Sequence, residues 1–304
     1  MPPMPPITEP ATVHLVDASP YIFRAHFSLP SSIKSPDGAR AGAVYGFASF
    51  LLKLIADERP THLGVAFDRN LNGSFRNDEY PAYKAQRDDP PPEIVAQIDP
   101  CLEMAAALGA ATFIDDRYEA DDIIGTLCAR LTPQGHGAVI VTSDKDLAQL
   151  VGDRVTLLDF AKGERYDAAA VAEKFGVRPD QITDLLALAG DPVDNIPGVS
   201  GIGRKTAAEI LAAFDHLEDV YDRLEELRTS KLRGARTFYA KLTASRDVAF
   251  LSKRLATVAA DAPLPAGFKG LTDLAYKGTD AARAEALFDR FGFKTIRERL
   301  PAAP

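Results

Sequence analysis

The chain has 304 residues, of which 46% are hydrophobic, and a formal net charge of −8. This length and apolar content allow one large domain or two smaller ones. No apolar run approaches a membrane span, and two cysteines are too few to staple a secreted fold. The proline-rich residues 1–11 lack the basic and apolar features of a signal peptide, so we expect a disordered tail on a cytoplasmic protein.

Short runs of β-branched residues alternate with helical patterns over the first 178 residues. The runs predict strands at 13–16, 62–67, 112–114, 138–142 and 155–158, and the patterns predict helices at 45–56, 94–108, 120–131 and 168–175. This alternation is typical of βαβ units. It predicts an α/β fold with a mostly parallel central sheet and helices on both faces.

Nine carboxylates accompany these predicted elements and the segment after them: Asp17, Asp68, Glu119, Asp121, Asp122, Asp144, Asp146, Asp191 and Asp194. Asp17, Asp68 and Asp144 follow three of the strands, at the sheet edge where such folds bind ligands. So many anions in one pocket repel each other unless cations lie between them. Oxygen-only ligands favour Mg²⁺ or Mn²⁺, and two such ions form a known arrangement for cutting phosphodiesters. The sequence therefore predicts a two-metal nuclease.

The spacing of the acids refines this expectation. Glu119 and Asp122 lie three residues apart at a helix entry and can share one helix face. Asp121 falls outside that face, so we expect it in the first turn, where the helix dipole tolerates negative charge. Asp144 and Asp146 follow a strand end with a spacing suited to metal or water ligation.

Residues 69–92, which we call the arch segment, are polar and rich in turn-forming residues. Aromatic and basic side chains alternate there: Phe75, Tyr80 and Tyr83 with Arg69, Arg76, Lys84 and Arg87. This mixture suggests stacking on unpaired bases together with phosphate contacts. The alternative is a surface loop whose tyrosines pack against the protein body. We favour a functional and mobile segment because it directly follows a candidate ligand, Asp68.

A glycine-rich turn between two predicted helices follows near residue 190. Its backbone N–H groups and basic residues suit contact with a DNA phosphate, and the residues concerned are Gly198, Gly201, Gly203, Arg204, Lys205 and Thr206. A mononucleotide P-loop is excluded because Arg204 separates glycine from lysine and no strand precedes it. A dinucleotide-binding loop is excluded because Thr206 occupies the third glycine position.

The net charge conceals a basic stretch. Residues 229–254 carry seven bases against one acid, and the bases are Lys231, Arg233, Arg236, Lys241, Arg246, Lys253 and Arg254. Such a stretch is either a solvated helix face or a surface that tracks phosphates, and composition alone does not separate the two.

Several motifs together resemble the 5′→3′ exonuclease/flap endonuclease family, in particular the nuclease domains at the N-terminus of bacterial DNA polymerases. They are LVDAS at 15–19, AVYGF at 43–47, FD at 67–68, FR at 75–76, YPAYK at 80–84, YEADDIIG at 118–125, VTSDKDL at 141–147 and DNIPGVSGIG at 194–203. The resemblance runs from about residue 12 to residue 300.

The resemblance implies a PIN-like nuclease core over 12–178 with a helical arch at 69–92. It implies a helical DNA-binding region over 179–304, with a helix–three-turn–helix at about 185–214. The activity implied is Mg²⁺-dependent cleavage of 5′ flaps and of nicked or gapped duplexes, leaving a 5′-phosphate and a 3′-hydroxyl. A monomer acting at the bacterial nucleoid, with a functional link to a DNA polymerase, completes this expectation.

The resemblance also implies residue roles. The first metal region would comprise Asp17, Asp68, Glu119, Asp121 and Asp122, and the second Asp144, Asp146, Asp191 and Asp194. Lys84 would contact the scissile phosphate with support from Arg76. Main-chain carbonyls near Val199 and Ile202 would hold K⁺. DNA would meet Phe75, Tyr80, Tyr83 and Arg87 together with the glycine-rich turn.

This sequence departs from the family pattern at two places. Ser143 replaces a glycine, and Pro192–Val193 replace a small polar pair, which stiffens the link between Asp191 and Asp194 and puts the second metal in doubt. Two other functions stay open: a flap-binding module with weak catalysis, and a nuclease directed at RNA. RNA primers paired to DNA are a further substrate, and the chain is either a stand-alone nuclease or a fragment of a longer polymerase.

Overall fold

The computed structural model describes residues 10–71 and 73–300, so most of the predicted N-terminal tail lies outside the described residues. The strands are β1 (Thr12–Asp17), β2 (His62–Asp68), β3 (Ala111–Asp115), β4 (Gly137–Val141), β5 (Val155–Asp159) and β6 (Glu164–Tyr166). The helices are α1 (Ser19–Ser28), α2 (Gly42–Glu58), α3 (Arg76–Glu79), α4 (Pro92–Ala107), α5 (Ala120–Leu131), α6 (Ala168–Phe175), α7 (Ile182–Ala189), α8 (Arg204–Phe214), α9 (Leu217–Asp222), α10 (Leu224–Thr229), α11 (Ala235–Ala244), α12 (Arg246–Ala256) and α13 (Ala281–Phe291). Short 3₁₀ turns are η1 (Thr132–Gln134), η2 (Asp146–Leu150), η3 (Pro179–Gln181), η4 (Leu271–Leu274) and η5 (Ile296–Arg299).

The strands form one sheet in the order β3-β2-β1-β4-β5-β6, in which only β6 runs antiparallel to its neighbour. The mostly parallel sheet predicted from the sequence is therefore confirmed. β1 lies between β2 and β4, and its last residue, Asp17, is in register with Ala66. Because the parallel strands end at the same edge, the residues that follow them meet there.

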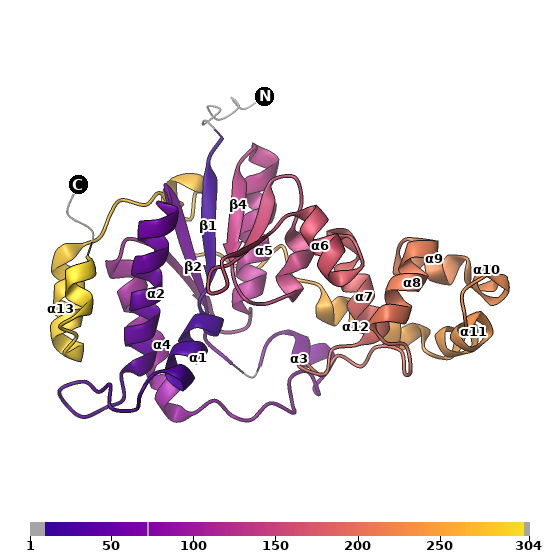
Figure 1. The fold of residues 1–304 in the computed structure, drawn as a ribbon, viewed down its shortest axis with the longest axis horizontal. Helices are drawn as coiled ribbons and strands as arrows, with labels where there is room; N and C mark the ends of the chain where they lie inside the picture. Colours follow the sequence, from indigo (N-terminus) through magenta and orange to yellow (C-terminus); the bar gives the residue numbers. More distant parts are fainter. Residues whose placement is uncertain (1–9, 72, 301–304) are drawn as a thin grey trace.

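Both faces of the sheet are buried, as a doubly covered parallel sheet requires. Along β1, Val13 and Leu15 pack into one core with α5 and the helices after it, whereas Val16 packs into the other with α1, α2 and α4. Figure 1 shows α2 and α4 on one side of the sheet and α5 on the other. The alternation follows from the two-residue period of a strand.

Two elements were not expected from the sequence. α1 begins with Pro20 in its first turn, which is a favourable position for proline, and buries Tyr21 and Ile22. β6 has only three residues and a largely exposed burial pattern, so it carries no apolar alternation that would mark a strand. β6 forms because it pairs with β5, and α1 is held because Tyr21 and Ile22 pack into the core that contains α2.

The helices α7 to α12 form a helical extension that projects away from the sheet, beyond α6, in Figure 1. α13 does not belong to it. Phe288 and Ala284 of α13 are fully buried in the core that contains α2 and α4. The last part of the predicted helical region, from about residue 281, therefore packs on the nuclease core instead of on the extension. Within the described ranges, no helix combines the length and apolar character needed to cross a bilayer.

Candidate functional site

Six of the nine candidate acids line one pocket of about 230 Å³ at the carboxyl edge of the sheet. These acids are Asp17, Asp68, Glu119, Asp121, Asp144 and Asp194. Lys84 and Arg87 of the arch segment line the same pocket, as do Ser19 and Phe23 of α1. The sequence signal for α1 was its position directly after Asp17, which brings its first turns to the strand end.

Backbone and side-chain contacts join the strand ends of the pocket. Asp17 ends β1 and accepts a hydrogen bond from Thr142 Oγ1 at 2.9 Å. Asp68 ends β2 and accepts the backbone N–H of Ala120 at 2.7 Å, at the start of α5. Asp121 follows in the first turn of α5, as expected. Four elements thus meet at one acidic surface.

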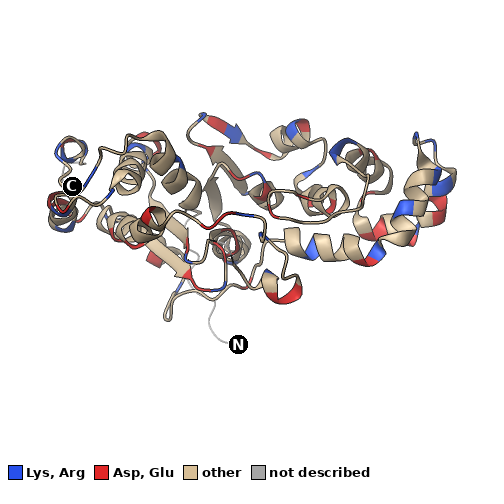
Figure 2. Ribbon diagram, turned by 90° about the horizontal axis from the view of Figure 1, so that it is seen from below, with Lys and Arg blue, Asp and Glu red and all other residues tan. Residues whose placement is uncertain are grey.

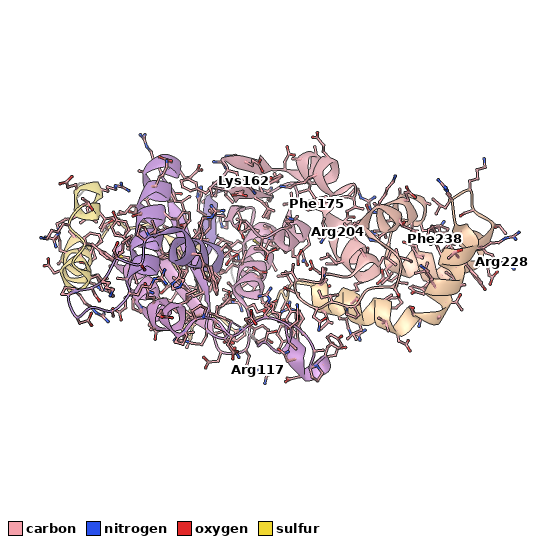
Figure 3. The ribbon with its side chains drawn as sticks, turned by 60° about the horizontal axis from the view of Figure 1, so that its bottom comes forward. Arg117, Lys162, Phe175, Arg204, Arg228 and Phe238 are labelled. Atoms are coloured by element: carbon pink, nitrogen blue, oxygen red, sulfur yellow. The ribbon has the colours of Figure 1, made fainter. Side chains whose placement is uncertain are left out.

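A second cavity of about 390 Å³ adjoins the first and is lined by Asp146 and Asp191. Asp144 and Asp194 line both cavities. Asp191 lies 3.5 Å from Arg204 at the start of α8, which Figure 3 places between the sheet and the far end of the helical extension. The division of the acids into two cavities parallels the two metal regions expected from the sequence, although the role of each acid stays a prediction.

The carboxylates perturb one another strongly. Burial, and then the charges of Asp68 and Asp144, raise the pKa of Asp17 well above its ordinary value. Burial and the charges of Asp144 and Asp17 do the same to the pKa of Asp121. The pKa of Asp146 is raised to about 7 by burial and by neighbouring Asp144 and Asp191. A nearby cation would stabilise the ionised form of each acid in this cluster.

The donor set fits hard divalent ions, because it consists of carboxylate oxygens that are crowded and partly desolvated. In residues 10–71 and 73–300, no three His, Cys, Asp or Glu side chains are yet arranged as a ready set of metal ligands. Instead, Lys84 pairs with Glu119, and Arg87 pairs with Asp194. In this conformation two cationic side chains of the chain itself neutralise part of the cluster.

The arch segment is docked on the loop that carries Asp191 and Asp194. The backbone N–H of Lys84 donates to the Asp194 carbonyl at 3.0 Å, and Asn195 Nδ2 donates to the Ala82 carbonyl at 2.6 Å. Gln86 Nε2 donates to the carbonyls of Pro192 and Val193 at 2.9 and 2.8 Å. The departure at Pro192–Val193 therefore lies directly against the arch segment.

Lys84 is well placed for chemistry in the pocket. Burial lowers the pKa of its ammonium, but the charges of Glu119 and Asp194 outweigh burial and raise it. Its backbone has a positive φ of 55°, a conformation that is uncommon for a residue with a side chain. The arch segment thus holds a protonated ammonium among the acids.

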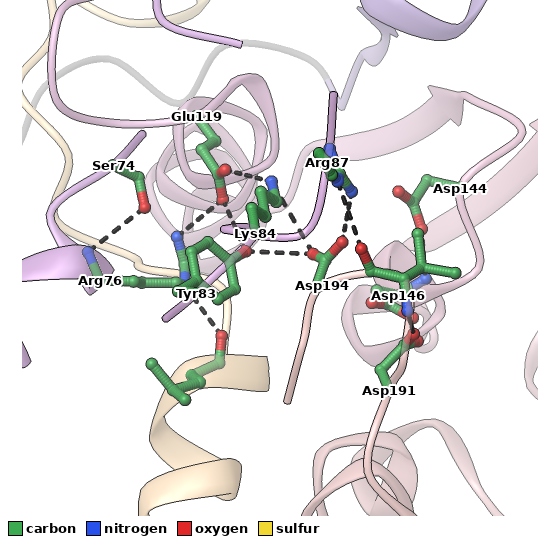
Figure 4. A network of polar contacts seen from close by, with 12 residues as sticks. Ser74, Arg76, Tyr83, Lys84, Arg87, Glu119, Asp144, Asp146, Asp191 and Asp194 are labelled. Carbon is green, nitrogen blue, oxygen red and sulfur yellow. Dashed lines mark hydrogen bonds and ion pairs between the residues drawn. The ribbon is translucent and has the colours of Figure 1, made fainter. Parts of the chain in front are cut away.

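Two expected active-site residues are instead internal. Arg76 is 4% exposed and Asp122 is 0% exposed, and they form a buried bidentate ion pair. Neither lines the two acid cavities in the described part of the chain. Arg76 therefore cannot meet a phosphate in this conformation, and Asp122 is neutralised by Arg76 rather than available to a metal. Figure 4 shows Arg76 contacting Glu119 from the side away from Asp144.

The aromatic residues of the arch segment also pack inward. Tyr83 is 3% exposed, and its hydroxyl, which has one proton to donate, lies 3.1 Å from a carboxylate oxygen of both Glu119 and Asp194. Its ring is thus not accessible to an unpaired base, so the alternative in which tyrosines pack against the body holds for Tyr83. Phe75 packs against Tyr118 in a tilted arrangement, with ring centroids 4.9 Å apart. Apart from residue 72, which is not described, α3 and the start of α4 are the only α-helical parts of residues 69–92.

The glycine-rich turn between α7 and α8 is tightly folded. Gly198 has φ 60°, and a Cβ there would lie 2.6 Å from the Cα of Gly190, so both positions require glycine. Val199 O accepts the N–H of Ile202 at 3.0 Å, and Gly201 O accepts Lys241 Nζ at 2.8 Å. An ammonium from α11 thus lies at the turn where a K⁺ ion was expected.

The basic stretch divides into bases that are paired with acids of the protein and bases that are exposed at the far end of the helical extension. Lys253 pairs with buried Asp184 at 2.7 Å, and Arg254 pairs with Glu79 of α3. Lys231, Arg233 and Arg236 are exposed near the far end of the extension. In the ribbon of Figure 2, basic and acidic residues are interspersed along the helices at that end. Some bases of the stretch are therefore structural, and others are free to meet a polyanion.

An acid-lined pocket at the carboxyl edge of a parallel sheet, faced by a lysine and continued into a helical extension, is an arrangement suited to a nuclease. The family comparison agrees with this class. The 5′-3′ exonuclease N-terminal resolvase-like domain matches residues 12–176, and the 5′-3′ exonuclease C-terminal SAM fold matches residues 177–282. The chain belongs to the 5′-3′ exonuclease family.

Curated relatives include DNA polymerase I of Bacillus caldotenax, which is 40% identical over 94% of this chain and 32% of its own length. DNA polymerase I of Bacillus subtilis is 39% identical over 97% of this chain and 33% of its own. The chain thus spans about a third of the length of these relatives.

Solved structures share the fold. T5 5′-exonuclease with bound zinc has a TM-score of 0.67 at 21% identity, covering 92% of this chain and 99% of that one. The catalytic core of Rad2 in complex with DNA substrate has a TM-score of 0.60 at 16% identity, covering 95% and 90%.

Proposed function

We propose that this protein is a structure-specific 5′ nuclease. It cleaves 5′ flaps and the 5′ ends of nicked or gapped duplex DNA and leaves a 5′-phosphate and a 3′-hydroxyl. The observation that carries the proposal is the convergence of six carboxylates and Lys84 on one pocket. The DNA and metal ions present in the T5 D15 flap endonuclease product complex, a structure with a TM-score of 0.63, support it.

Two Mg²⁺ ions, for which Mn²⁺ can substitute, would be held by the acids of the two adjoining cavities. Bound there, such ions supply Lewis acidity and make water a better nucleophile. Asp17, Asp68, Glu119 and Asp121 form the wall of the first cavity, and Asp144 and Asp194 are shared with the second. The crowded carboxylates therefore repel one another unless cations offset their charge.

Lys84 acts on the substrate in this proposal. In the structure its ammonium forms an ion pair with Glu119. Divalent ions bound in the pocket would neutralise that carboxylate in its place. The ammonium is then free to hydrogen-bond the scissile phosphate, where negative charge grows in the transition state. Arg87, which is 35% exposed, offers a second cation beside it at the pocket mouth.

The helical extension grips the duplex next to the cleavage point. The start of α8 presents unpaired backbone N–H groups with Arg204 and Lys205, and Lys241 adds a charge beside Gly201. A K⁺ ion at the carbonyls near Val199 and Ile202 would add to this contact. The exposed bases Lys231, Arg233 and Arg236 extend the positive surface along the duplex.

The test is incision of a 5′-flap duplex labelled on the flap strand, with Mg²⁺ and with the metal chelated. The expected result is a cut near the flap junction only with Mg²⁺, giving a downstream strand that DNA ligase can seal because it carries a 5′-phosphate. Binding of the flap without incision would instead support the non-catalytic module. Preferential cutting of single-stranded RNA would support the RNA-directed nuclease.

A further inference from the structure

Helix α12 is joined to the glycine-rich turn at its middle. Ser252 of α12 is fully buried, and its Oγ accepts the backbone N–H of Gly198 at 3.0 Å. The same hydroxyl donates to the Val248 carbonyl at 2.8 Å within the helix. Gly198 is also packed closely against Gly190, so the turn has little room to move relative to α12. If binding to a DNA backbone displaces the turn, α12 should therefore be displaced with it.

The C-terminal end of α12 is joined to the arch segment by Arg76. The last carbonyls of a helix have no partner within the helix, and they attract a positive charge. Arg76 Nε donates to the Leu255 carbonyl at 2.9 Å, and Arg76 Nη2 donates to the Thr257 carbonyl at 2.8 Å. One guanidinium thus caps the helix end from a residue 179 positions away in the chain.

The same guanidinium reaches the acidic pocket. Arg76 Nη1 donates to Glu119 Oε2 at 3.0 Å and to Asp122 at 2.8 Å, and Nη2 donates to Asp122 at 2.7 Å. With the two carbonyls at the C-terminal end of α12, these contacts use all five N–H donors of an arginine. Asp122 also accepts the backbone N–H groups of Glu119 and Ala259, at 3.1 and 2.8 Å. The buried network has no spare donor to absorb a change at one end.

Glu119 connects the Arg76 network to the cleavage pocket, because it contacts Arg76 and also lines the pocket. It lines that pocket, pairs with Lys84 and accepts the hydroxyl of Tyr83. Figure 4 shows Arg76, Tyr83 and Lys84 gathered around the Glu119 carboxylate. A continuous series of polar contacts therefore runs from the glycine-rich turn through α12 and Arg76 to Lys84.

We propose that Arg76 is a positioning residue that couples duplex binding at the glycine-rich turn to the placement of Glu119 and Lys84 for cleavage. α12 transmits the signal as a rigid element, because its middle is fixed to the turn and its end to the guanidinium. A fully satisfied buried network rearranges as a unit, which is what such coupling needs. The proposal rests on the nuclease function proposed above.

The experiment compares two substrates that carry the same labelled 5′ strand, one with duplex arms and one single-stranded. Single-turnover cleavage rates at saturating protein are measured for the unchanged protein, Arg76→Lys, Ser252→Ala and the double variant. Glu79→Gln is the matched control, since it removes an exposed ion pair between α3 and α12 and leaves the Arg76 contacts in place. Melting by circular dichroism establishes that each variant is folded.

The expected result is that duplex arms accelerate cleavage by the unchanged protein and by Glu79→Gln. In Arg76→Lys and in Ser252→Ala this acceleration falls by about tenfold, while the Kd for the duplex substrate changes little. The double variant loses no more than either single variant, because both act on one pathway. If Arg76→Lys does not fold, Ser252→Ala and its control still decide the question.

Equal loss of rate on both substrates would overturn the coupling, since it is what a merely structural role produces. Additive losses in the double variant would overturn it as well. Both of these outcomes leave the nuclease function standing. Absence of cleavage of either substrate by the unchanged protein would overturn the proposed function and the coupling together.

Discussion

The guanidinium of Arg76 and the carboxylate of Asp122 form a bidentate ion pair, with N–O distances of 2.7 and 2.8 Å, sealed from solvent. Burying two charges is tolerated only because each satisfies the other and because further hydrogen bonds complete both. Removing one partner leaves the other charged and unpaired. This pair is therefore a sensitive point of the whole fold.

We predict that Arg76→Ala lowers the free energy of unfolding by about 3–5 kcal/mol, measured by urea denaturation. The double variant Arg76→Ala/Asp122→Ala should recover part of this loss, because the unpaired carboxylate is gone. Arg117→Ala is the matched control, since Arg117 pairs with Asp78 while both are more than half exposed, and should cost less than about 1 kcal/mol. A loss in Arg76→Ala no larger than in Arg117→Ala would show that the buried pair contributes little.

The acid cluster makes stability depend on pH and on metal. A carboxyl whose pKa is raised on folding, as for Asp17, Asp121 and Asp146, binds its proton more tightly in the folded state. The free energy of unfolding therefore falls as pH rises from about 4, the unfolded value, through the raised folded values.

We predict that Mg²⁺ raises the urea midpoint at pH 8 more than at pH 5, since at pH 5 protons already neutralise these acids. Asp146→Asn, which removes a carboxyl of pKa about 7, should make the metal-free protein less sensitive to pH over this interval. If Mg²⁺ shifts the urea midpoint equally at both pH values, these carboxylates do not bind it.

Lys84→Ala should slow single-turnover cleavage of a 5′-flap duplex by about 10²-fold at saturating Mg²⁺, the usual loss for one electrostatic contact in a transition state. Lys162→Ala is a suitable control, because Lys162 pairs with Asp159 and lines neither acid cavity among the described residues. A rate for Lys84→Ala equal to that of the control would remove Lys84 from the chemistry.

Lys241→Met should make duplex binding depend more on K⁺. The ammonium of Lys241 contacts Gly201 and supplies a fixed charge at the turn, and its loss removes about 1 kcal/mol, or roughly fivefold in Kd, in Na⁺ buffer. K⁺ should restore most of the affinity. Lys231→Met, at an exposed position, should weaken binding equally in both buffers. If Lys241→Met weakens duplex binding equally in Na⁺ and in K⁺, Lys241 has no part in the K⁺ site.

The sheet and the positions of four acids of the first cavity could be predicted from local sequence. Asp17 and Asp68 come at the ends of apolar strands, and Glu119 and Asp121 open a helix, so their position follows from strand and helix periodicity alone. The geometry of parallel sheets then brings them to one edge. No distant contact has to be known for this inference.

The roles of Arg76, Asp122 and Tyr83 could not be predicted in this way. Arg76 is buried because the end of α12, far away in the chain, covers it, and nothing near residue 76 signals that cover. Asp122 differs from Asp121 only by a turn of about 100° around α5, which points one acid to the pocket and the other to the guanidinium. The packing of α13 on the core is likewise set by contacts between distant segments.

The variant Asp121→Asn tests whether the buried carboxylates hold the metal ions of a nuclease. Cleavage and binding of one labelled 5′-flap duplex are measured side by side, with Asp116→Asn, an exposed acid outside the pocket, as control. We predict that Asp121→Asn lowers the single-turnover rate by at least about 10²-fold and leaves the Kd for the flap within roughly threefold. Equal loss of cleavage and binding, or a rate like that of Asp116→Asn, would contradict it.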